Sequence, residues 1–174
     1  MRLPRFAAGL VALALLAACG GSSPKLSKLP PDAVILAFGD SLTFGTGASE
    51  ETNYPAALEK LVGRKVWAAG TPGEVSEAGL ARLPAALEYY KPKLLILCHG
   101  GNDFLRKLDD AQTAANLRSM IRLAQAQGAE VVLIGVPPPG LMLSIPGLYA
   151  DIAQEFKLPY DEGALKKILG DNEL

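Results

Sequence analysis

Three short polar segments of this 174-residue chain contain the side chains best suited to chemistry, and each segment follows an apolar run. The first segment holds Ser41, the second Gly73 and the third Asn102. A serine hydroxyl can act as a nucleophile, whereas backbone N–H groups and an asparagine amide can bind a developing oxyanion. Each segment by itself also fits an ordinary turn, because Gly, Asp, Ser and Asn are common turn residues.

The apolar runs predict the strands that must position these segments. Strands are expected over residues 33–38, 65–69, 94–98 and 131–136, with a short fifth strand over 158–160. Apolar spacing and capping residues predict helices over residues 54–62, 77–89, 111–127, 149–156 and 163–169. We expect Pro84 to kink or restart the second of these helices, since proline removes a backbone hydrogen bond.

This alternation of strands and helices predicts an α/β domain with a central, mostly parallel sheet covered by helices on both faces. In such sheets, ligands bind beyond the carboxyl ends of the strands, at the point where the strand order reverses. Ser41, Gly73 and Asn102 all follow the ends of predicted strands. The sequence therefore places the three residues at the ligand-binding edge of the sheet.

Together, the three segments resemble the sequence blocks of the GDSL family of SGNH serine hydrolases, from around residue 33 to residue 169. Ile-Leu-Ala-Phe-Gly-Asp-Ser-Leu-Thr is similar to the first block, whose serine is the nucleophile, which implies that role for Ser41. Gly73 falls at the glycine of the second block, whose backbone N–H serves the oxyanion hole. Gly-Gly-Asn-Asp is similar to the third block, which implies that the Asn102 side chain completes that hole.

The resemblance implies a three-layer, flavodoxin-like SGNH-hydrolase fold and hydrolysis of carboxylic esters or thioesters through an acyl-enzyme on Ser41, without a cofactor. Residues 79–84, Gly-Leu-Ala-Arg-Leu-Pro, are similar to the branch containing periplasmic thioesterase I/lysophospholipase L1 and the arylesterases. In such sites, loss of one oxyanion donor typically costs about 10²–10³ in turnover. Asp40 is expected to organise the turn through backbone hydrogen bonds and to transfer no proton.

The family's last block, Asp-x-x-His, has no match in these residues, so the triad Asp and His are missing. The only histidine is His99, whereas the triad histidine of the family comes from the opposite side of the site. We therefore interpret residues 32–174 as an SGNH domain that stops before this block and lacks the final helix, and we favour a truncated copy over a genuine stop. The chain as written is expected to hydrolyse esters poorly.

Alternative functions use the same residues differently. The main alternative is an inactive relative or a non-catalytic envelope protein that binds an acyl ligand in the same cleft. A receiver-type or flavodoxin-like module with Asp40 as phospho-acceptor would leave Ser41, Gly73 and Asn102 as coincidences. Residues 45–47, Gly-Thr-Gly, are only a fragment of a dinucleotide fingerprint, and no P-loop lysine follows them.

The amino-acid composition limits the kinds of molecule that the chain is expected to bind. With 17 basic and 18 acidic residues and no basic stripe, the chain is not expected to bind nucleic acid. One histidine and one free cysteine are too few ligands for an ordinary zinc site, so no metal is predicted. We expect a monomer that binds a small acyl ester or thioester. Apolar side chains of residues 137–143 are candidates for an acyl groove, or for core or lid packing.

The N-terminus resembles a bacterial lipoprotein signal. Arg2 and Arg5 precede an apolar run over residues 6–18, which is shorter than the roughly 20 residues of a membrane-spanning helix. Leu-Ala-Ala-Cys then resembles a lipobox, which implies that residues 1–18 are a signal peptide. An ordinary secretory signal that contains a cysteine is the alternative.

The lipobox resemblance implies that Cys19 is lipidated and anchors the chain to a membrane, with a flexible linker over residues 19–31. Gly20, in place of an aspartate after the lipidated cysteine, favours delivery to the periplasmic face of the outer membrane. Cys98 then stays as the only free thiol, which excludes a disulfide framework.

Overall fold

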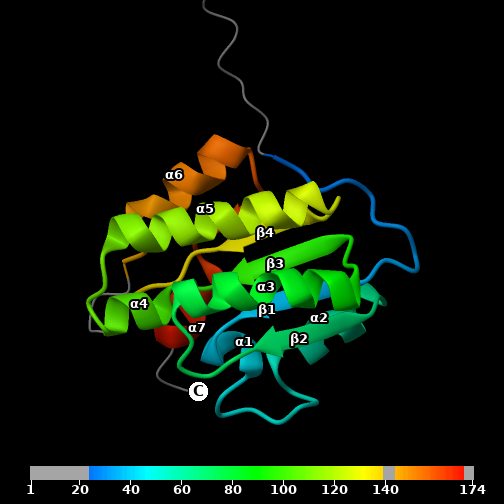
Figure 1. Cartoon of the computed structure of the whole chain (residues 1–174). Coiled ribbons are helices and arrows are strands. Elements are labelled where there is room, and N and C mark those ends of the chain that lie inside the picture. The colour runs from blue at the N-terminus through cyan, green and yellow to red at the C-terminus, as the bar shows by residue number, and fades with distance from the viewer. Residues whose placement is uncertain (1–23, 139–143, 171–174) are drawn as a thin grey trace, which may run out of the picture.

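The computed structural model describes residues 24–138 and 144–170 (Figure 1). The predicted signal peptide, Cys19 and residues 139–143 of the candidate acyl groove lie outside these ranges. Five strands form one sheet in the order β2-β1-β3-β4-β5, and every pairing between them is parallel. The strands are β1 (Ile35–Gly39), β2 (Val66–Gly70), β3 (Leu94–Cys98), β4 (Glu130–Ile134) and β5 (Tyr160–Asp161).

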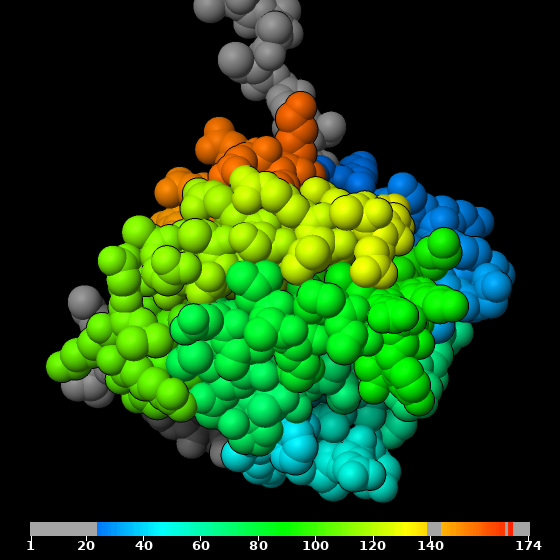
Figure 2. All heavy atoms as spheres, viewed as in Figure 1, coloured from blue at the N-terminus to red at the C-terminus, as the bar shows by residue number. Residues whose placement is uncertain are grey.

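Seven helices complete the described part of the chain. They are α1 (Ser41–Phe44), α2 (Tyr54–Val62), α3 (Ser76–Tyr90), α4 (Gly101–Leu105), α5 (Asp110–Ala126), α6 (Gly147–Phe156) and α7 (Ala164–Gly170). From the side shown in Figure 2, the surface consists mainly of α3 and α5, which lie over the sheet. The predicted α/β class with a parallel sheet between helices is confirmed.

Successive side chains of β1 point to opposite faces of the sheet, so β1 contributes to a hydrophobic core on each face. Leu36 and Phe38 are buried in the larger cluster, which includes apolar side chains of α3, α5 and α6. Ile35 and Ala37 belong to the smaller cluster, against which side chains of α2 pack. Because β1 is covered on both sides, all five of its residues are buried, as its continuous apolar run predicted.

The two faces of the sheet are not covered equally. Val131 and Leu133 of β4 are buried, whereas Val132 and Ile134 on the alternate face are only partly buried. Beside α2, this second face carries a hollow of about 370 Å³ with an almost wholly apolar lining, which includes Ile96. No helix in residues 24–138 and 144–170 is long and apolar enough to cross a membrane.

The predicted elements are present: the bounds of α2 and β3 match the prediction, and those of the other elements differ by at most two residues at either end. The fifth strand is formed by Tyr160 and Asp161, so it begins two residues after the predicted start at residue 158. Pro84 does not restart a helix, since α3 continues through it as one element, and the proline lies exposed on its outer side. The short helices α1 and α4 were not predicted as separate elements, although both follow the polar segments.

Candidate active site

Ser41 lies where the strand order reverses. The chain leaves β1 and continues to β2 on one side, while β3 pairs with β1 on the other. This is the switch point at which parallel sheets of this order bind ligands. Ser41 is the first residue of α1, it is half-buried, and its hydroxyl has no hydrogen-bond partner among the residues that the structure describes. The predicted nucleophile is therefore accessible and uncommitted.

The turn that presents Ser41 is held by its neighbours. Asp40 caps α1 by accepting a hydrogen bond of 3.1 Å from the Leu42 N–H, and the Gly45 N–H closes the helix on the Ser41 carbonyl. At the end of β2, Gly70 lies so close to α1 that an added Cβ would overlap the backbone nitrogen of Phe44. Only glycine allows this approach, so β2 and α1 fix each other.

Gly73 lies at the tip of an exposed turn after β2, with a left-handed φ of +74°. The turn is closed by a hydrogen bond of 3.2 Å from the Glu74 N–H to the Thr71 carbonyl. The Gly73 carbonyl accepts a hydrogen bond of 2.7 Å from the Arg106 guanidinium. This contact from the end of α4 is one of those that hold the turn.

Asn102, in α4, joins the three segments. Its Nδ2 donates to Asp40 Oδ2 at 3.2 Å and to the Glu74 carbonyl at 3.0 Å. The residue next to Ser41 and the residue next to Gly73 therefore bind the same amide group. An oxyanion held by this amide would replace one of these two acceptors. The oxyanion-hole roles of Gly73 and Asn102 stay predictions, but the three predicted residues do lie at one place.

Asp40 is almost fully buried, with 1% of its surface exposed. Burial raises the pKa of its carboxyl above the ordinary value, while the Leu42 N–H, the nearby His99 and the Asn102 amide oppose that rise. The capping hydrogen bond to Leu42 agrees with the predicted structural role of Asp40.

A second carboxylate, Glu74, lies beneath the turn and was not recognised in the sequence. Its carboxylate forms a bidentate ion pair with Arg82 of α3, with N–O distances of 2.9 and 2.7 Å. Its Oε2 also lies 3.2 Å from His99 Nε2. Burial alone would raise the pKa of Glu74, but hydrogen bonds from Arg82 and His99 outweigh it and lower that pKa. Glu74 therefore stays charged within this network.

His99 is fully buried, with 0% of its surface exposed. Its Nε2 faces Glu74, and its Nδ1 accepts a hydrogen bond of 2.9 Å from the Gly100 N–H. Gly79 of α3 leaves room for the ring, since an added Cβ there would overlap Nε2. Both ring nitrogens are thus committed, and neither is free to take a proton from Ser41. The neighbouring thiol of Cys98 is also buried, which raises its pKa and leaves it unreactive.

A further buried cluster anchors α4. Asp103 accepts hydrogen bonds from the Ser76 N–H at 2.8 Å and from the hydroxyls of Ser76 and Thr113, and Asn116 donates to the Ser76 hydroxyl at 2.9 Å. The cluster ties α4 to the start of α3 and to α5, and it therefore fixes the backbone of Asn102. The position of Asp103 directly after Asn102 was the only sequence signal for it.

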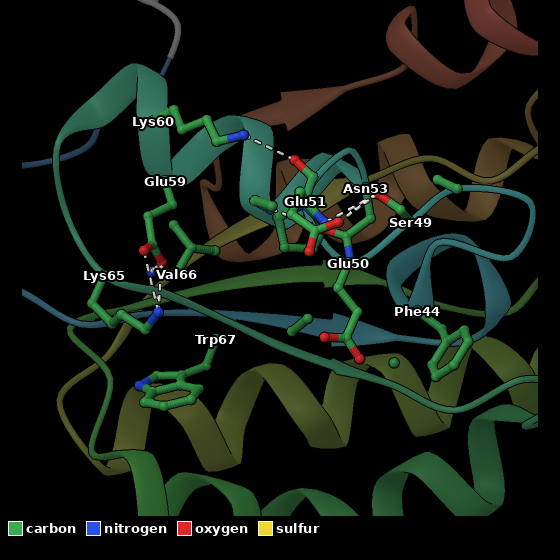
Figure 3. A pocket seen from close by; sticks show the side chains of 15 residues that line it. Phe44, Ser49, Glu50, Glu51, Asn53, Glu59, Lys60, Lys65, Val66 and Trp67 are labelled. Carbon is green, nitrogen blue, oxygen red and sulfur yellow. Dashed lines mark hydrogen bonds and ion pairs between the residues drawn. The ribbon is translucent and has the colours of Figure 1, made fainter.

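A hollow of about 650 Å³ lies along the edge strand β2 (Figure 3). In Figure 3, the rings of Trp67 and Phe44 lie on either side of the Glu50 carboxylate. Ser41 does not line this hollow, although Phe44 is one helical turn from it in α1. The sequence did not predict this feature, because a strand pattern does not tell which strand lies at the edge.

The sheet order, the serine at its switch point and the adjoining glycine turn and asparagine define an α/β protein of the SGNH-hydrolase architecture. The chain belongs to the GDSL-like lipase/acylhydrolase family, whose sequence profile matches residues 37–160. The family that the sequence blocks predicted is thereby confirmed.

Curated relatives carry hydrolase names. The chain is 39% identical over 110 residues to Esterase TesA of Pseudomonas aeruginosa, a match covering 60% of this chain and 55% of that protein. It is 33% identical over 132 residues to Thioesterase 1/protease 1/lysophospholipase L1 of Escherichia coli K12, covering 72% of this chain and 64% of that protein. The chain thus spans between about half and two thirds of the length of these relatives.

Solved structures agree on the fold. AlinE4, an SGNH-hydrolase family esterase, superimposes with a TM-score of 0.73 at 29% identity, covering 83% of this chain and 82% of that one. The psychrotrophic esterase EstA of Pseudoalteromonas sp., in a structure inhibited by monoethylphosphonate, gives a TM-score of 0.74 at 25% identity, covering 82% and 84%.

Proposed function

We propose that this chain acts on carboxylic ester or thioester bonds, with Ser41 as the nucleophile. The observation that carries the proposal is the link from Asp40 through the Asn102 amide to Glu74, which brings the Ser41 turn and the Gly73 turn together beside a half-buried serine. The relatives named esterase and thioesterase support the same class of substrate.

In the proposed reaction, Ser41 Oγ attacks the acyl carbonyl carbon, and the hydroxyl proton passes to a base. The carbonyl oxygen becomes an oxyanion, which accepts hydrogen bonds from the N–H groups of Ser41 and Gly73 and from the Asn102 amide. Collapse expels the alcohol or thiol and leaves an acyl-enzyme, which water then hydrolyses. Phe44, one helical turn from Ser41 in α1, lines the hollow along β2, and we propose that part of the substrate rests there.

We further propose that these 174 residues hydrolyse esters slowly. They contain no Asp-x-x-His sequence, and their one histidine holds both ring nitrogens in hydrogen bonds to Glu74 and Gly100. A neutral serine hydroxyl is a poor nucleophile without a base. The same observation favours a second candidate function, in which the site binds an acyl ligand and releases it without turnover.

The test is hydrolysis of a p-nitrophenyl ester in buffer with and without imidazole, which can act as an external base. We expect imidazole to accelerate p-nitrophenol release from the wild-type chain beyond its effect on the free ester, and Ser41→Ala to abolish that gain. Mass spectrometry should place a single acyl group on the peptide containing Ser41. Ester binding with no acyl group on Ser41 would instead support the binding function.

For localisation, we propose that Cys19 carries a lipid anchor, because residues 16–19 match the order of a lipobox after a charged and apolar start. Metabolic labelling with a radioactive fatty acid in a bacterial host should mark the wild-type chain and not Cys19→Ser. Equal labelling of both chains, or of neither, would contradict the anchor, and Cys98→Ser is the matched control.

A further inference from the structure

We propose that Glu74, held by Arg82 and His99, is a positioning residue that fixes the oxyanion donors of Gly73 and Asn102. This role rests on the proposed function, since it matters to the reaction only if Ser41 acts as a nucleophile. Glu74 follows Gly73 directly, and its own carbonyl accepts the Asn102 amide. Whatever holds the Glu74 backbone therefore holds both predicted donors.

The side chain of Glu74 is held from two directions. Arg82 donates from Nε to Oε1 at 2.9 Å and from Nη2 to Oε2 at 2.7 Å, which is the planar, two-bond geometry that arginine favours. His99 Nε2 reaches Oε2 at 3.2 Å from the end of β3. Because Glu74 is 9% exposed and His99 fully buried, these bonds are largely shielded from water.

Arg82 extends this network to the sheet. Its Nη2 also donates to the Ala69 carbonyl at 3.1 Å and to the Gly39 carbonyl at 3.4 Å, so it contacts the ends of β2 and β1. Its guanidinium carbon lies 4.1 Å from the centre of the Phe38 ring. One side chain from α3 thereby aligns the ends of two strands with the turn that carries Gly73.

The network gives the donors a fixed position relative to Ser41. Glu74 lies in the Gly73 turn and directly contacts the end of β3 and α4. Through Arg82, it is also connected to the ends of β1 and β2. Oxyanion stabilisation depends on donors that are held in place before the charge develops. A displacement of about 1 Å from a distant change can cost about 10²-fold in rate. Loosening Glu74 should therefore slow acylation without weakening ester binding.

The experiment compares Glu74→Gln with wild type and with Glu155→Gln, which breaks an exposed Arg118–Glu155 pair of 2.6 Å on the far helices. Acylation of Ser41 by a p-nitrophenyl ester is measured with imidazole over a range of ester concentrations. NMR measures hydrogen exchange of the Asn102 side-chain amide in the same three proteins. Arg82→Lys keeps the charge but not the two-bond geometry, and circular dichroism confirms that each variant folds.

We expect Glu74→Gln to slow acylation by about 10–100-fold at an unchanged half-saturating ester concentration, with faster exchange of the Asn102 amide. Arg82→Lys should lie between this variant and wild type, and Glu155→Gln should match wild type. Acylation within twofold of wild type, or unchanged exchange, would overturn the proposal. If wild type never acylates Ser41, the proposed function fails, and Asn102 exchange alone then decides the positioning role.

Discussion

Ser41 and His99 follow neighbouring strands at the same edge of the sheet, yet their surroundings differ completely. Ser41 is half-buried, and its hydroxyl has no hydrogen-bond partner within residues 24–138 and 144–170, whereas His99 is fully buried with hydrogen bonds at both ring nitrogens. A serine, a histidine and a carboxylate are therefore present near one site. They do not form a catalytic triad, because the imidazole faces Glu74 and α3 and not the serine.

The difference shows that burial and hydrogen bonding, and not residue type, assign the roles. A triad histidine must have one nitrogen free for the nucleophile and the other held by a carboxylate. His99 meets the second condition and fails the first, because the Gly100 N–H occupies Nδ1. Ser41 is therefore accessible to a substrate, whereas His99 has a structural role at the same edge of the sheet.

The largest expected effect is on stability, on the His99 side. Glu74→Ala would remove the carboxylate that pairs with Arg82 and contacts His99, and breaking a buried ion pair costs about 3–5 kcal/mol. Because Arg82 is partly exposed, we expect Glu74→Ala to lower the free energy of unfolding, measured in urea, by about 3 kcal/mol, at the low end of this range. Ser41→Ala should change stability by less than about 0.5 kcal/mol, since the Ser41 hydroxyl forms no hydrogen bond in the part of the chain that the structure describes. Equal losses in the two variants would contradict the contrast between the two sides.

A second effect concerns the close packing beneath Ser41. Gly70→Ala should cost about 1–3 kcal/mol in urea unfolding and should slow Ser41 acylation, because the added methyl group displaces α1. Gly147→Ala is the matched control, since an added Cβ there meets nothing within 4 Å. We expect this control to stay within about 0.5 kcal/mol of wild type. A Gly70→Ala variant as stable as the control would show that β2 and α1 are not in this contact.

The pH dependence of stability should have opposite signs on the two sides. Glu74 has a lowered pKa, so its charged form stabilises the fold above its ordinary pKa of 4.5, and this contribution is lost as the pH falls through the lowered value. Asp40 has a raised pKa, because burial penalises its charge, so its contribution is present below 3.8 and is lost as the pH rises through the raised value.

Urea unfolding at pH 3 and pH 7 measures this difference. The stability of Glu74→Gln relative to wild type should fall between pH 3 and pH 7, and that of Asp40→Asn should rise. Relative stabilities that shift in the same direction for both variants would refute these assignments. Glu155→Gln, on the exposed surface, provides the reference for general effects of charge removal.

The sequence allowed prediction of the strands, the longer helices and the three segments that meet at the site. Apolar runs such as β1 and β3 are unambiguous, and parallel topology then brings their ends together. The role of His99 depends on Glu74 and Gly79, which are distant in sequence and meet only in the folded chain. Similarly, the pattern of β2 indicated a strand but not its edge position, where Trp67 is 42% exposed.

The most direct test of the account is ester turnover by wild type and Ser41→Ala, each measured without and with imidazole. Triad members act as a unit, so a serine without its base contributes little to the rate. The oxyanion donors alone retain an acceleration of about 10³–10⁴-fold over the reaction in water. Without imidazole, the turnover rates of the two proteins should therefore differ by less than about tenfold. With imidazole, wild type should become faster than Ser41→Ala. Turnover of about 1–10³ per second without imidazole, abolished by Ser41→Ala, would contradict the claim that these residues hold a nucleophile without its base.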